Sequence, residues 1–216
     1  MEIGNELYIS RHYKRSDYLG LGLDVKSPIG KWRKAVLIFN DRICGRYFNP
    51  IKDLIEDKKI YDNGFAAMSL MCLLIDTFYQ FENGVENTKY TNQENYTSFM
   101  QNSLGFGDKE STFFYHNIRC GLLHSAETLN GSYLVSDKID GSLIAKFDSK
   151  YQRYGLAVSI RGMYDSLKSY FNDYCNALLS PSDDRGWKLR SNFISKMNYI
   201  TSDRHKKNFR LMDMNR

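Results

Sequence analysis

Two side chains suited to phosphate chemistry lie five residues apart in the stretch 115-YHNIRCGLLHSAET-128. Arg119 can hold two phosphate oxygens in a planar fork, and His124 titrates near neutral pH, so it can give or take a proton. RNA cleavage without a metal needs a base for the 2′-OH, an acid for the leaving 5′-oxygen and positive charge on the pentavalent phosphate. One histidine supplies one proton-transfer group, so two chains would supply both. The two residue types are therefore suited to this chemistry, and the need for two proton-transfer groups would be a physical reason for a dimer.

The spacing alone does not decide between a site and two unrelated polar residues. Five steps of an α-helix separate two side chains by about 140° and by about 7.5 Å along the axis. A lone histidine on a helix is more often a packed or surface residue, and His124 can be read that way too. Gly121, between the pair, is unfavourable inside a helix and suggests a close backbone approach.

Several neighbouring polar residues could contact the pair, but each could also have a purely structural role. His116 can be a surface residue, and Asn117 and Glu127 can merely finish the helix. Asp76 and Glu82 end the apolar part of an earlier helix; either could orient Arg119, but the pattern favours solvated positions near a helix end. The candidates for a weak second ring of residues are Cys120, Asn117, His116 and Glu127.

Other chemistries have less support. Cys120 and His124 have the i, i+4 spacing of one helix face, but no third orienting group is evident for a nucleophilic pair. The stretch 19-LGLGLDV-25 lacks the helix that a phosphate-binding glycine loop requires. No H-e-x-x-H pattern occurs, and the four cysteines form no C-x-x-C pair. We therefore expect no metal, no cofactor and no disulfide framework.

The run 119-RCGLLH-124, late in a predicted helix and followed by a predicted hairpin, resembles the R-x4-6-H motif of HEPN domains. The order of elements is similar over about residues 31–200, whereas the specific match is about ten residues long. The resemblance implies an all-α bundle. It also implies a metal-independent endoribonuclease of a prokaryotic defence or toxin–antitoxin system, active as a homodimer, with Arg119 and His124 in the site and a possible cognate antitoxin or defence partner.

Two positions depart from that pattern. Active members often carry Asn, Asp or His after the motif arginine, whereas this chain has Cys120, and a thiol is a weak hydrogen-bonding group. Members silenced by a nucleotidyltransferase carry Tyr two positions after the histidine, where this chain has Ala126. The alternative function is therefore a non-catalytic HEPN module that binds RNA or protein, or that serves for dimerisation.

The composition is typical of a soluble globular protein. Hydrophobic residues make up 42% and charged residues 25%, and the net charge of +5 fits an anionic partner such as RNA. The stretch MEIGNELYISRHYKR has no apolar core of a signal peptide, and the run 65–75 is too short to span a bilayer. We therefore expect a cytoplasmic protein with no membrane contact. The basic C-terminal tail could grip RNA or simply be solvated; its cations include Arg204, Lys206, Lys207 and Arg210.

The elements that must position the pair follow from hydrophobic periodicity. Trp32, Val36, Phe39, Ile43 and Tyr47 form one helical stripe, and Asn49-Pro50 is expected to end that helix. The runs 133–135 and 143–145 flank Asp140-Gly141 and predict a β-hairpin over about 131–147. The predicted helices cover 31–48, 51–59, 64–83, 93–103, 111–126, 154–179 and 184–200.

The predicted organisation is an N-terminal arm (1–30), a helical domain (31–200) and a C-terminal tail (201–216). Because most of the periodic segments have the spacing of helices, the fold class is all-α. The expected architecture is a HEPN-like helical bundle with a small β-hairpin insertion.

Overall fold

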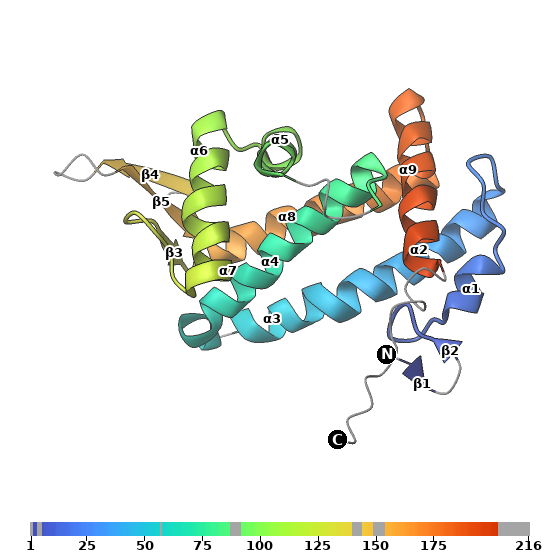
Figure 1. Cartoon of the computed structure of the whole chain (residues 1–216), viewed down its shortest axis with the longest axis horizontal. Coiled ribbons are helices and arrows are strands. Elements are labelled where there is room, and N and C mark those ends of the chain that lie inside the picture. Colours follow the sequence, from blue (N-terminus) through green and yellow to red (C-terminus); the bar gives the residue numbers. More distant parts are fainter. Residues whose placement is uncertain are drawn as a thin grey trace, which may run out of the picture.

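The computed structural model describes residues 2–3, 6–56, 58–86, 92–139, 144–148 and 154–202. It is an all-α fold with a small β insertion, as predicted. Long helices run along the molecule, and shorter ones cross them at both ends (Figure 1). The long helical segments are α2 (Ile29–Ile43), its continuations η1 (Cys44–Phe48) and α3 (Asn49–Ile55), α4 (Lys59–Asn83) and α8 (Ile160–Leu179).

The crossing helices lie at opposite ends of this layer. At one end α6 (Asp108–Phe113), the π-helical turn η3 (Phe114–Cys120) and α7 (Gly121–Ser125) form one continuous helix, beside the β insertion (Figure 1). At the other end α9 (Asp184–Thr201) crosses near α1 (Arg15–Leu19). The remaining elements are α5 (Gln93–Leu104), β1 (Glu2–Ile3), β2 (Glu6–Leu7), β3 (Tyr133–Val135), β4 (Ile144–Asp148) and β5 (Tyr154–Ser159).

An aromatic cluster holds the long helices together. The ring of Phe39 lies 4.4 Å from that of Phe81, 5.4 Å from that of Phe171 and 5.3 Å from that of Phe193, centroid to centroid. These contacts join α2, α4, α8 and α9, and all four rings are buried. Large aromatic side chains bury much apolar area each, so this cluster stabilises the packing of the four helices against one another.

The helix ends follow local sequence signals. The side chains of Asn92, Ser159 and Asp183 each accept a hydrogen bond from a backbone amide in the first turn of α5, α8 and α9. Gly84 and Gly105 end α4 and α5 with φ of 67° and 73°, the left-handed conformation that glycine adopts without strain. These signals are local, so they can be read from the sequence.

The prediction that Pro50 ends the first long helix is wrong. Phe48 and Asn49 both keep right-handed helical backbone angles, so the helix continues into α3. The π-helical turn Cys44–Phe48 directly precedes Asn49–Pro50. A proline ring cannot fit against the carbonyl four residues earlier in a regular α-helix, and the wider turn gives it room.

The β insertion is present, but its strands pair differently from the predicted hairpin. β3 does not pair with β4: β5 lies between them, parallel to β3 and antiparallel to β4. The predicted start of a helix at Tyr154 is therefore wrong, because Tyr154–Ser159 forms the central strand. Leu156, Ala157 and Val158 are fully buried in the structure, and such an apolar run does not distinguish a strand from a buried helix. The predicted turn at Asp140-Gly141 lies outside the described residues.

Helix α4 is long and apolar enough to cross a membrane by length and composition alone. It is longer than the predicted helix 64–83 because it begins at Lys59. Within the protein, 56% of its most apolar stretch is buried, which is typical of the core helix of a bundle. The prediction of a buried core helix therefore agrees with its packing.

Candidate functional site

Arg119 lies in η3, the π-helical part of the crossing helix, and His124 lies in α7. The predicted helix over 111–126 is confirmed, with its start moved to Asp108. The π-helical turn covers Phe114–Cys120 and includes Arg119, whereas His124 lies in the regular α-helical part that follows. Such turns are rare and occur frequently at functional sites.

The guanidinium of Arg119 is held between helices. Its Nη2 lies 3.7 Å from Asp76 Oδ2 of α4, and its Nη1 donates to Cys120 Sγ at 3.8 Å. The guanidinium carbon lies 5.3 Å from the ring centre of Tyr115, one turn earlier on the same helix. The Arg119 side chain is 22% exposed, so its position is fixed while part of it still reaches solvent.

The neighbours of Arg119 keep its guanidinium protonated, and they leave part of its positive charge without a close anionic partner. Burial acts to lower the pKa of Arg119, but Cys120, Asp76 and Tyr115 outweigh burial and raise it. For Asp76, burial raises the pKa more than Arg119 lowers it. Arg119 Nε is buried with no hydrogen-bond partner among the described residues, and the contact with Asp76 is a single long one. The fork of Arg119 is therefore not saturated by the protein.

His124 differs from Arg119 in being exposed. It lies in the last turn of α7, which ends at Ala126 with φ of 52°. In the described part of the chain, no hydrogen bond or ion pair joins His124 to Arg119 or to any other side chain. The structure thus places the two residues on one helix, with Arg119 positioned by neighbours and the His124 imidazole open to solvent.

The predicted second ring of residues is only partly found around the pair. Cys120 contacts Arg119, but Asn117 is buried elsewhere: its amide donates to Ser132 Oγ at 3.2 Å and accepts from Asn130 Nδ2 at 2.8 Å. Asn117 therefore ties the helix to the loop before β3. His116 and Glu127 are exposed; His116 packs its ring edge-on against Tyr115, and the Glu127 carboxylate accepts the Thr128 amide. The tail residues Arg204, Lys206, Lys207 and Arg210 lie outside the described residues.

The close backbone approach predicted at Gly121 is confirmed. A Cβ at this position would lie 2.4 Å from the carbonyl oxygen of Glu127 and 3.0 Å from Leu129 Cγ. The chain reverses at Ala126 and Asn130, which both have positive φ, and the Leu129 amide donates to the Asn117 carbonyl at 2.8 Å. Gly121 therefore lets the segment after His124 fold back onto the helix.

Sequence reasoning underestimated Asp76 and missed Tyr115. Asp76 was expected at a solvated position, but its carboxylate is only 18% exposed and lies beside Arg119 of the crossing helix. The position of Tyr115 four residues before Arg119 could have indicated the stacking, since such residues share a helix face. The pairing with Asp76 has no such local signal.

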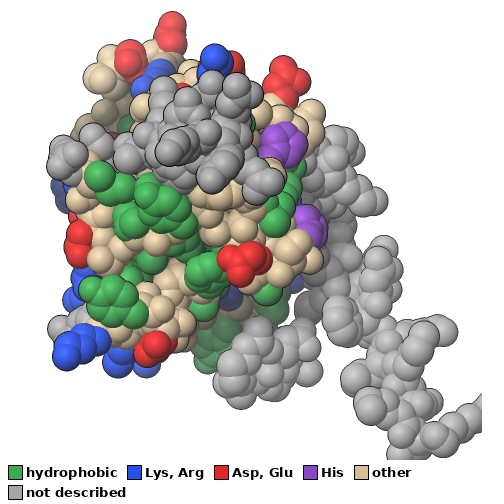
Figure 2. Space-filling view, turned by 90° about the vertical axis from the view of Figure 1, so that its left-hand side faces the viewer, with side chains coloured by type: hydrophobic (Ala, Val, Ile, Leu, Met, Phe, Trp, Pro, Cys, Tyr) green, Lys and Arg blue, Asp and Glu red, His purple; other side chains and the backbone are tan. Residues whose placement is uncertain are grey.

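The end of the molecule that carries α7 and the β insertion also exposes hydrophobic side chains. Figure 2 shows them on this face, with histidine side chains at its edge. Four large hydrophobic side chains of these elements and of the start of α4 are exposed. They are Tyr61 (78%), Phe65 (41%), Leu123 (36%) and Tyr133 (46%).

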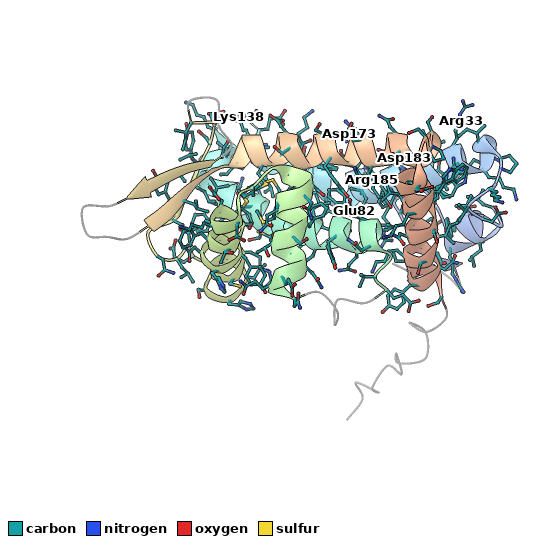
Figure 3. All side chains as sticks on the ribbon, turned by 90° about the horizontal axis from the view of Figure 1, so that it is seen from above. Arg33, Glu82, Lys138, Asp173, Asp183 and Arg185 are labelled. Carbon is teal, nitrogen blue, oxygen red and sulfur yellow. The ribbon has the colours of Figure 1, made fainter. Side chains whose placement is uncertain are left out.

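A separate groove of about 570 Å³ lies between α5, α8 and the start of α9. Figure 3 shows Glu82, Asp173, Asp183 and Arg185 around this junction. The Glu82 carboxylate accepts from Ser103 Oγ at 3.2 Å and from Tyr170 OH at 3.0 Å, and pairs with Arg185 at 3.3 Å. Glu82 therefore joins four helices, which corrects its reading as a solvated helix end.

Within the described ranges, no group of three or more His, Cys, Asp or Glu side chains is arranged to hold a metal ion. Comparison of the chain with models of protein families, with curated proteins and with solved structures found no match.

Proposed function

We propose that this protein is a metal-independent endoribonuclease of the HEPN type that acts as a homodimer, with Arg119 and His124 as its catalytic residues. The observation that carries the proposal is the state of Arg119. It is positioned by Asp76 and Tyr115 and remains charged and partly exposed. Within the described chain its Nη groups contact only the Asp76 carboxylate at 3.7 Å and the Cys120 thiol at 3.8 Å, so a phosphate oxygen that reaches the exposed part of the side chain would find N–H donors that the protein does not saturate.

The exposure of His124 supports a role in proton transfer. An imidazole without a partner in the described chain is free to contact a ligand, and it lies one turn of helix beyond the arginine. The nearby exposed hydrophobic side chains, including Phe65 and Leu123, offer apolar area for a second copy of the chain. A homodimer through this end would bring two histidines and two arginines together.

In the proposed reaction, one His124 takes the proton of a ribose 2′-OH, and the 2′-oxygen attacks the adjacent phosphorus. The bond from phosphorus to the 5′-oxygen breaks, and the partner's His124 protonates that oxygen. Arg119 stabilises the negative charge on the phosphate oxygens of the transition state. The products carry a 2′,3′-cyclic phosphate and a free 5′-OH.

The proposed setting is the cytoplasm of a prokaryotic cell, in a defence or toxin–antitoxin system with a cognate partner protein. The second candidate function is a non-catalytic module that binds RNA or protein. It is favoured by one observation: the groups next to Arg119 are a carboxylate and a thiol, and Cys120 stands where active members of the resembled family often carry a stronger hydrogen-bonding group.

The test is incubation with total tRNA and rRNA in EDTA, followed by analysis of the new RNA ends. We expect 2′,3′-cyclic phosphate ends from the wild-type protein. His124→Ala should reduce the cleavage rate at least about 100-fold, the scale of a lost proton-transfer group. His116→Ala is the matched control, because His116 is also an exposed histidine of this helix, and its rate should stay within a factor of two.

Equal loss in both variants would contradict the assignment of His124. A strictly monomeric mass at micromolar concentration would contradict the composite site. RNA binding without any cleavage would favour the non-catalytic module.

A further inference from the structure

The positive charge of the chain is concentrated far from Arg119. Residues 8–46 hold nine Lys and Arg and three Asp, a formal charge of +6, whereas the whole chain totals +5. The rest of the chain therefore carries −1. The segment comprises α1, α2 and their connections, at the end of the molecule opposite the β insertion (Figure 1).

The three acids of this segment are engaged by its own backbone. Asp17 accepts the Lys14 amide at 2.6 Å, and Asp24 accepts the Lys26 amide at 2.7 Å. Asp41 accepts the His12 amide at 2.9 Å and pairs with His12 Nδ1 at 2.7 Å. Asp17 and Asp24 thus stabilise turns, and Asp41 holds the His12 imidazole. None of the three forms an ion pair with a lysine or arginine in the described chain.

Six of the cations, by contrast, are exposed without a partner in the described chain or donate to neutral carbonyl groups. Arg11, Lys26, Arg33 and Lys34 are exposed, and none of them has a partner among the residues that the structure describes. Arg33 lies at the outer end of the molecule in Figure 3. Arg42 and Arg46 donate to the carbonyl oxygens of Ile9 and Tyr8, which leaves their charges uncompensated.

Contacts with α2 arrange several of these groups in a row. The Cβ of Arg11 would lie 3.6 Å from a Cβ at Gly45, His12 binds Asp41, and Lys31 Nζ lies 3.4 Å from the Gly22 carbonyl oxygen. The stretch of α2 and η1 from Lys31 to Arg46 is about 22 Å long at the rise of a helix. We call this row the basic α2 surface; its members are Arg11, His12, Lys31, Lys34 and Arg46.

A hollow of about 710 Å³ opens within this surface. His12, Tyr13 and Lys34 line it, together with Ser16 and Asp17 of α1, Gly20 and Leu21 just after α1, and Leu37 and Ile38 of α2. Leu37 in its lining is 56% exposed, so its side chain is available to a ligand in the hollow. The Lys34 cation and the apolar side chains of Leu21, Leu37 and Ile38 suit a nucleotide unit, whose phosphate and base need different surroundings. The Asp17 carboxylate in the lining already accepts the Lys14 amide.

We propose that the basic α2 surface binds single-stranded RNA, with the phosphate backbone along Arg11, Lys34 and Arg46 and one base in the hollow beside His12 and Leu37. A single strand is favoured because an unstacked base can enter the hollow, whereas a duplex keeps its bases inside. The inference takes RNA as the polymer from the proposed function. It assigns the binding to a surface separate from Arg119 and His124.

The test measures binding of a fluorescent single-stranded RNA by anisotropy in EDTA, in a His124→Ala background so that the RNA stays intact. Arg11→Glu with Lys34→Glu reverses two exposed charges that have no partner in the described chain. We expect at least about a tenfold loss of affinity at moderate salt. The slope of log K against log salt should fall by about 1.4, since each phosphate contact of a single strand contributes about 0.7.

The matched control is Lys109→Glu with Lys188→Glu, which makes the same change in net charge at two exposed lysines on other helices. Its affinity should fall less than threefold. Equal losses in both double variants would overturn the inference, because bulk charge would then explain the binding. So would the absence of RNA binding by the parent protein, or binding to phosphatidylserine vesicles instead of RNA.

This outcome is separable from that of the cleavage test. RNA binding that depends on Arg11 and Lys34, without any cleavage, would support the surface and contradict the nuclease. Cleavage that depends on His124, with unchanged binding in the Arg11 and Lys34 variant, would do the reverse. Circular dichroism and thermal melting of each variant exclude loss of folding as the cause.

Discussion

The cationic side chains at the two ends of the molecule differ in their contacts. At the end with the β insertion, Arg119 is packed against Tyr115 and faces the carboxylate of Asp76. At the end with α1, the exposed Arg11 and Lys34 have no partner in the described chain, and the neighbouring acids bind backbone amides. A positioned charge suits a transition state, whereas mobile surface charges suit a polymer held by many weak contacts. Under the two proposals above, the chain would hold the reacting phosphate at one end and the rest of the RNA strand at the other.

The largest effect should come from changing the shape of the Arg119 charge without removing it. Arg119→Lys replaces a planar fork with a point ammonium, so cleavage should slow about 100-fold, the scale of one lost transition-state donor. Single-turnover cleavage assays measure this rate. Arg33→Lys, at an exposed position of the opposite end, is the control and should leave the rate within a factor of two. If both variants cleave equally fast, the two ends do not differ in the way described.

A smaller effect is expected on stability when the tight packing around Gly121, near Arg119, is disturbed. Gly121→Ala places a Cβ against the Glu127 carbonyl, so the free energy of unfolding should fall by about 1–3 kcal/mol. Gly30→Ala is the control in α2, where an added Cβ meets nothing within 4 Å, and it should be neutral or raise stability by up to about 1 kcal/mol. Urea denaturation measures both. A Gly121→Ala protein as stable as the control would show that the reversal after His124 is not tightly packed.

The smallest effect concerns how Asp41 and Asp76, one carboxylate at each end, change the pH dependence of folding stability. Burial acts to raise the pKa of Asp41, but hydrogen bonds from Ser10 and His12 outweigh it, so the pKa is lowered. Ionised Asp41 therefore stabilises the fold at pH values above the pKa that Asp41 has in the unfolded chain. This stabilisation is lost as the pH falls through the lower pKa of the folded state. Burial raises the pKa of Asp76 despite Arg119, so protonating Asp76 favours the folded state.

Between pH 6 and pH 3, Asp41→Asn should therefore lose less stability than the wild type, and Asp76→Asn should lose more. Urea denaturation at both pH values measures the difference. The same change of stability with pH in the two variants would mean that the two carboxylates have similar environments, contrary to the comparison of the two ends.

Much of the helical scaffold could be predicted because its determinants are local. The stripe from Trp32 to Tyr47 marks the buried face of α2, the apolar run of α4 marks the most buried helix, and Gly84 ends that helix. Arg119 and His124 were recognised as candidates for the same reason: their residue types and spacing lie within one short stretch. Hydrophobic periodicity and capping depend on neighbours within a few residues, so the sequence alone determines them.

Other features depend on segments far apart in the chain, and only the tertiary structure decided them. β5 separates β3 from β4 because strand pairing depends on which edges meet in space, not on the nearest turn signal. Asp76 reaches Arg119 because α4 packs against the crossing helix, and no pattern within either helix encodes that contact. Likewise, the net charge of +5 follows from composition, whereas its concentration beside the hollow of His12 and Lys34 arises from how residues 8–15 fold onto α2.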